Sequence, residues 1–117
     1  MTMEANLHSL LTSVCPRVYP DIAPDGVDKP YVTWQHLGGD SIRYLDNTPA
    51  DKRNTRTQIN VWSRTRLEAL TLSRQIEDAM CISSNFVATP QGESTSIYES
   101  VTQLYGSVQR FEIFADR

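Results

Sequence analysis

The hydrophobic positions at the start of the chain follow the period of an amphipathic helix. They lie three and four residues apart and are Leu7, Leu10, Leu11 and Val14. Glu4 stands in the first turn, where the helix dipole favours a negative charge. Pro16 pushes the residue before it out of the helical region. The pattern therefore predicts a helix over residues 3–14 that packs its apolar face on a sheet.

A second amphipathic pattern begins near Thr65. Thr65 is followed three residues later by Glu68, which is the spacing of a capping box, in which each side chain satisfies a backbone N–H of the first turn. The apolar positions that follow at three- and four-residue steps are Ala69, Leu72, Ile76, Ala79 and Met80. We expect this helix to end near Cys81 and to lie with that face on the sheet.

Two strands are predicted before the second helix. The first, over residues 31–37, is rich in residues that favour strands and is ended by Gly38 and Gly39. In the second, over residues 55–62, apolar Ile59 and Val61 alternate with polar neighbours, so one face is apolar and the other polar. The four prolines within residues 16–30 indicate an extended connector rather than a linker between domains.

The last third of the chain has the pattern of a hairpin. Residues 97–104 and 108–114 are both rich in strand-forming residues, and Tyr105, Gly106 and Ser107 form the expected turn. Residues 85–88 are a short apolar segment before a turn. The order of elements predicts one α+β domain over residues 1–117. We expect an antiparallel sheet of about four strands with two helices packed on one face.

Residues 38–54 form a long predicted loop between the first two strands. Loops beyond about 12 to 15 residues in a compact domain are usually functional or disordered. The apolar residues of this loop are Ile42, Tyr44 and Leu45. Two interpretations stay open: a flexible hairpin tip, or an arm that becomes ordered against a partner with these three residues as its anchor.

The basic residues are nearly all arginine, because Lys29 and Lys52 are the only lysines among the 11 basic residues. Several arginines lie on or beside the loop and the strand after it: Arg43, Arg53, Arg56, Arg64 and Arg66. Arginine makes planar bidentate contacts and is enriched at protein interfaces. The skew fits either a surface that pairs with acidic groups of another subunit or the codon bias of a GC-rich genome.

The two tryptophans have different expected roles. We expect Trp34 to pack in the core, whereas Trp62 falls on the polar face of its strand and is an interface candidate. The residues predicted at an interface are Ile42, Arg43, Tyr44, Leu45, Arg53, Arg56 and Trp62.

Composition and charge narrow the function. The 117 residues, 39% hydrophobic and 21% charged, fit one folded domain. A net charge of -3 argues against a general nucleic-acid binder. No apolar run approaches the roughly 20 residues that cross a bilayer. Glu4 stands where a signal peptide would be basic, so neither secretion nor membrane insertion is expected.

Candidates for catalysis or metal binding are few. His8 lies on the polar side of the first helix, and His36 has no cysteine or carboxylate partner at ligand spacing. Cys15 and Cys81 are too far apart for a redox pair and are expected to be reduced, although a bridge between them stays open. No glycine-rich phosphate-binding motif is present. We expect no catalytic residue, no cofactor and no metal.

Several short segments, taken in their order along the chain, resemble a known family. They are Arg17-Val18-Tyr19-Pro20, Lys29-Pro30-Tyr31-Val32-Thr33-Trp34-Gln35, Arg56-Thr57-Gln58-Ile59-Asn60-Val61-Trp62-Ser63, Glu68-Ala69 and Arg110-Phe111-Glu112-Ile113-Phe114. In this order, and over nearly the whole chain, they resemble the small tail-completion proteins, of the tail-terminator type, of long-tailed bacteriophages and prophages.

The resemblance implies a structural α+β subunit that forms a ring, often a hexamer, at the head-proximal end of the tail tube. Such a ring would stop tube polymerisation and offer a surface to the head connector. The implied partners are further copies of the chain, the tail tube protein and a head completion or connector protein. The implied location is the virion tail, after assembly in the bacterial cytoplasm.

Two other function classes remain open at this point. One is a different neck or minor tail component, which a different ring size or partner would distinguish. The other is an unrelated small enzyme or ligand-binding domain. That class predicts a concave pocket with converging polar groups.

Overall fold

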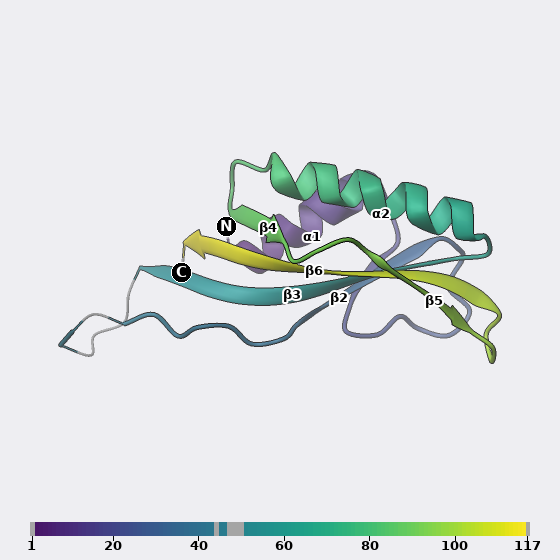
Figure 1. The fold of residues 1–117 in the computed structure, drawn as a ribbon, viewed down its shortest axis with the longest axis horizontal. Coiled ribbons are helices and arrows are strands. Elements are labelled where there is room, and N and C mark those ends of the chain that lie inside the picture. Colours follow the sequence, from purple (N-terminus) through teal and green to yellow (C-terminus); the bar gives the residue numbers. More distant parts are fainter. Residues whose placement is uncertain (1, 44, 47–50, 117) are drawn as a thin grey trace.

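Two helices cover one face of a mixed sheet in the computed structural model, which describes residues 2–43, 45–46 and 51–116 (Figure 1). The helices are α1 (Met3–Val14) and α2 (Arg66–Cys81). The strands are β1 (Val18–Pro20), β2 (Tyr31–His36), β3 (Lys52–Ser63), β4 (Val87–Pro90), β5 (Thr95–Glu99) and β6 (Leu104–Asp116). The α+β class agrees with the prediction from the sequence.

The sheet has six strands in the order β1-β2-β3-β6-β4, and β5 pairs with β6 beside β4. β1 runs parallel to β2, whereas every other pair is antiparallel. The prediction of about four antiparallel strands therefore undercounts the strands and misses the parallel pair. The strands it lacks, β1 and β4, have three and four residues and each ends in a proline, so neither carries a period that a sequence pattern can reveal.

The predicted turn at residues 105–107 is wrong, because these residues lie inside β6. The chain turns instead at residues 100–103, where Gln103 takes a positive φ of 56°. Gly106 is a strand residue that pairs with Trp62 on one side and with Ile97 on the other. A Cβ on Gly106 would lie 2.8 Å from atoms of both side chains, so its missing side chain makes room for them.

Both helices begin at threonine caps. Thr2 Oγ1 accepts a hydrogen bond from the Ala5 N–H, and Thr65 Oγ1 accepts one from the Glu68 N–H. The predicted capping box is only half formed, because the Glu68 carboxylate accepts the hydroxyl of Ser63 instead of the Thr65 N–H. That N–H donates to Ser63 Oγ at 3.4 Å, so Ser63 completes the cap. The predicted bounds of the first helix are confirmed.

The core lies between the helices and the sheet. Its fully buried members include Leu7 and Leu11 of α1, Ile76 and Met80 of α2, and Val32, Val61, Phe111 and Ile113 of the sheet. Trp34 is buried in this cluster, as predicted. The predicted apolar face of α2 is buried except for Ala79, which is half-buried.

The opposite face of the sheet has no helix on it and is mainly polar (Figure 1). Its side chains hydrogen-bond to one another across three strands. Arg110 Nε donates to Gln58 Oε1 at 3.3 Å, Gln58 Nε2 donates to Asn60 Oδ1 at 3.1 Å, and Asn60 Nδ2 donates to Thr33 Oγ1 at 3.3 Å. This row is typical of the solvated face of an antiparallel sheet. We call it the open face.

Candidate functional site

The predicted loop is anchored beside β3 at its root. We define the arm as residues 37–43 and 45–46. The Leu37 N–H donates to the Arg56 carbonyl and the Arg56 N–H donates to the Gly38 carbonyl, both at 2.7 Å. The Asp40 N–H donates to Asn54 Oδ1 at 3.0 Å. The first residues of the arm therefore extend the sheet past the end of β2, and residues 52–54, predicted as loop, belong to β3.

Beyond the root, the arm leaves the body of the protein. The described segment 45–46 lies at one end of the molecule, past the ends of β3 and β6 (Figure 1). The molecule measures 52 × 26 × 25 Å, so the arm forms one end of a body about twice as long as it is wide. Leu45 is 110% exposed, so its side chain lies in solvent. Tyr44, predicted beside it at an interface, lies outside the described residues.

The arm and the start of β3 enclose a hollow of about 280 Å³. Its walls are Asp40, Ser41, Ile42, Lys52, Arg53 and Asn54. Of the predicted interface residues, Ile42 is half-buried in this hollow and Arg43 is exposed beyond it. The hollow has mixed polarity and lies where the arm meets the sheet.

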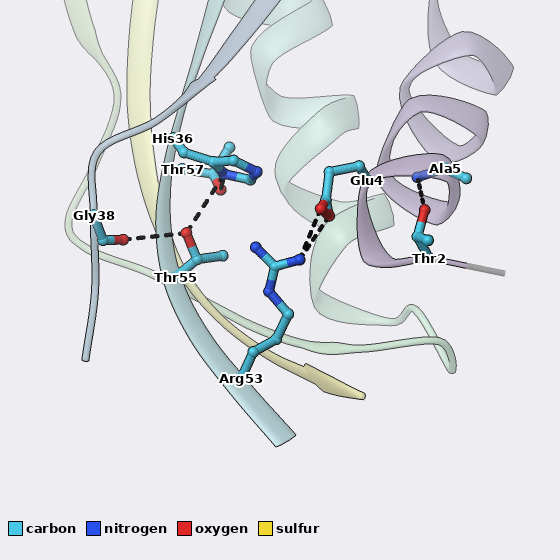
Figure 2. A network of polar contacts seen from close by, with 8 residues as sticks. All are labelled: Thr2, Glu4, Ala5, His36, Gly38, Arg53, Thr55 and Thr57. Atoms are coloured by element: carbon cyan, nitrogen blue, oxygen red, sulfur yellow. Dashed lines mark hydrogen bonds and ion pairs between the residues drawn. The ribbon is translucent and has the colours of Figure 1, made fainter. Parts of the chain in front are cut away.

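Arg53 is tied to the first turn of α1 (Figure 2). Its Nη1 donates to Glu4 Oε1 at 2.7 Å and to Oε2 at 2.8 Å. Figure 2 shows this ion pair beside His36, whose Nδ1 lies 3.2 Å from Thr57 Oγ1. The pair joins the N-terminus of the chain to the root of the arm. Arg53 is one of the predicted interface residues, and in the folded chain its charge is paired with that of Glu4.

The Glu4–Arg53 pair makes stability depend on pH. Partial burial alone would raise the pKa of Glu4, but the hydrogen bond and charge of Arg53 outweigh it and lower that pKa. A carboxyl whose pKa is lower in the folded than in the unfolded state stabilises the fold above its ordinary range. It loses that contribution as the pH falls through the lowered value.

Glu4→Gln should therefore lower the free energy of unfolding at neutral pH by about 0.2 to 1 kcal/mol, the range for partly exposed ion pairs. The difference from the wild type should shrink towards zero once the pH falls below the lowered pKa of Glu4, because the carboxyl is then protonated in the folded protein as well. Urea titrations of both proteins at neutral and at acidic pH measure this difference in the free energy of unfolding. A deficit that persists at acidic pH would show that the effect does not come from the ionised carboxylate of Glu4.

The remaining predicted interface residues lie on the open face. Arg56 is exposed and stands opposite Glu112 in the β3–β6 register. Trp62 is half-buried, and a Cβ on Gly106 would touch its ring, so part of the indole covers the sheet. Trp62 and the arm lie at opposite ends of β3 (Figure 1). The structure therefore does not bring the predicted residues into one patch.

Two exposed features lie at the end of the molecule away from the arm, and sequence reasoning did not single out either of them as a candidate surface. The first is β5, in which all five residues are exposed and which pairs with β6 alone. The second is a groove of about 370 Å³ between the start of α2 and Pro30. Leu67, 76% exposed, lines the groove and lies off the apolar stripe of α2. That off-stripe leucine could have pointed to the groove from the sequence.

Within residues 2–43, 45–46 and 51–116, no group of three or more His, Cys, Asp and Glu side chains is placed to hold a metal ion. No helix in this part is long and apolar enough to span a membrane. Cys15 is buried, Cys81 is exposed, and both thiols are free.

The model of the family Tail completion protein gp17 matches residues 3–116. The chain belongs to this family of bacteriophage tail-completion proteins. The match spans both helices and all six strands, so the resemblance predicted from the sequence is confirmed. No curated protein matches the chain. Family membership makes this tail-completion protein a virion-associated part of the phage tail and favours a structural role over an enzymatic one.

Proposed function

We propose that this tail-completion protein caps the head-proximal end of the tail tube as a ring of identical copies, with six as the expected number. The ring stops tube polymerisation and presents the surface on which the head connector docks. The role is structural, and no residue of the chain is assigned to catalysis. Membership of the tail-completion family over residues 3–116 is the observation that carries the proposal.

The shape of the protein supports a ring. A contact between two different surfaces of the same chain repeats with a fixed rotation and closes into a ring when that rotation divides a full turn. The arm stands at one end of a body 52 Å long, so it can reach a neighbour without displacing an element of its own fold. It supplies one of the two unlike surfaces that such a contact needs.

The partners that follow are further copies of the chain, the tail tube protein and a head completion or connector protein. Assembly would take place in the cytoplasm of the host bacterium, on a phage or prophage tail. A net charge of -3 fits a part that meets proteins rather than one that binds nucleic acid.

The test combines solution mass with imaging. Light scattering over a concentration series, with the protein alone and with purified tail tube protein, should show a ring or a monomer that becomes one on the tube. Electron microscopy of the same mixtures should show capped tubes of limited length. A chain that stays monomeric and leaves tube growth unchanged would contradict the proposal and favour a different neck component.

A further inference from the structure

We propose that Leu45 at the end of the arm seats in the groove at the start of α2 of a second copy, and that this contact links copies head to tail. The inference rests on the proposed ring and names the two surfaces that would build it. The occupant of the groove is thus another copy of this chain.

The groove has an apolar floor and a single charge. Its walls are Pro30, Thr65, Leu67, Glu68, Thr71, Leu72 and Gln75. Pro30, Leu67 and Leu72 supply the apolar surface, and Leu67 stays 76% exposed although the core lies close behind it. A volume of about 370 Å³ accommodates one leucine side chain with the backbone beside it. Seating Leu45 there would remove two exposed leucines from water at once.

The two surfaces lie at opposite ends of the same chain. The arm forms one end of the long axis, and α2 begins at the other end (Figure 1). The start of α1 and the end of β6 both lie towards the arm and away from the groove (Figure 1). The arm therefore cannot fill the groove of its own molecule. A second copy placed end to end brings them together.

The arm carries charges of both signs, because Asp40 and Asp46 accompany Arg43, and one pair of opposite charges can form across the contact. Glu68 is the one charged residue among those that line the groove. Arg43 is exposed on the arm, two residues before Leu45. An arginine and a carboxylate at the edge of an apolar contact favour one orientation and speed the encounter. Arg43 and Glu68 would in this way set the direction of the arm in the groove.

The test uses one variant for each surface. Leu45→Asp removes the apolar tip and Leu67→Asp removes the groove wall. Both side chains are largely exposed, and an aspartate in the first turn of α2 suits the helix dipole, so both variants should fold. Ile22→Asp is the matched control, because Ile22 is 81% exposed on a different part of the surface.

Each variant alone should need at least tenfold more protein than the wild type to assemble, under whichever condition the wild type forms its ring. An equimolar mixture of the two should form dimers and stop there. In that dimer the intact Leu45 of one variant occupies the intact groove of the other, and both remaining ends are defective. The control should assemble like the wild type. Light scattering and native mass spectrometry count the copies.

Disulfide cross-linking gives a second measurement. With Cys81→Ser, which removes the exposed thiol, Leu45→Cys combined with Thr71→Cys should give a ladder of covalent oligomers on a non-reducing gel. Neither single variant should do so. Covalent dimers from Leu45→Cys alone would mean that two arm tips meet each other, which would overturn the proposal.

Failure of the contact can be told apart from failure of the function. Wild-type rings or capped tubes that form equally well from both aspartate variants would overturn the contact and leave the proposed function standing. A wild type that neither self-associates nor caps tubes would overturn both. Rings from the mixed variants would show that the copies meet through other surfaces.

Discussion

Leu11→Ala should lower the free energy of unfolding by about 2 to 5 kcal/mol. Leu11 is fully buried in the cluster where α1 meets the sheet and α2. Its truncation removes apolar contact and leaves a cavity that the surrounding strands can fill only in part. Because a domain of this size is stable by about 5 to 15 kcal/mol in total, the loss should be visible as a large shift of the urea midpoint.

The neighbouring leucine provides the control. Leu10 is only half-buried and packs against the edge of the same cluster, so Leu10→Ala removes the same atoms from a more exposed site. Its cost should be clearly smaller than that of Leu11→Ala. Equal losses for the two variants would show that α1 does not present the face described above to the core.

The helices were predicted well because their apolar positions recur over several turns. The stripe of α1 and the threonine with Glu68 at the start of α2 are local features, and local energetics decide where a helix begins and ends. The prediction of which side chains of β3 face the core is also confirmed, because alternation along a strand fixes which of them meet it.

The sequence pattern could not predict features that depend on contacts between residues distant in the chain. β1 is a strand because Val18–Pro20 pairs with β2, and its own three residues give no pattern. The glycine at position 106 led to a predicted turn. Gly106 lies in β6 instead, where it pairs with Trp62 of β3 and with Ile97 of β5. In both cases a tertiary contact decides against the local preference.

The candidate site shows the same division. The sequence singled out the arm and its apolar residues, and the structure gives that segment a fixed root and an exposed tip. The link between Arg53 and Glu4 joins residues 49 positions apart, so no spacing rule could have indicated it. The groove beside Leu67 is also lined by Pro30, which is distant in the sequence, so the exposed leucine could indicate only one of its walls. Whether these surfaces form an interface stays a prediction.

The root of the arm depends on one glycine. Gly39 has a positive φ of 147°, and a Cβ there would lie 2.5 Å from the Asn54 carbonyl oxygen and 2.7 Å from the Thr55 Cα. Both neighbours are backbone atoms of β3, which is paired with β6 over its whole length and cannot yield. Any side chain at Gly39 must therefore push the arm away from the sheet.

Gly39→Ala should cost about 1 to 3 kcal/mol from the strained backbone. About 1 kcal/mol more should be lost for each root hydrogen bond that breaks. Gly38→Ala is the matched control, because Gly38 also has a positive φ, 93°, but a Cβ there meets nothing within 4 Å. Urea unfolding of both variants separates the clash from the conformational cost.

A displaced root also moves Leu45, so Gly39→Ala should weaken tube capping more than Gly38→Ala does. Equal behaviour of the two variants would show that close contact with β3 does not hold the arm in place.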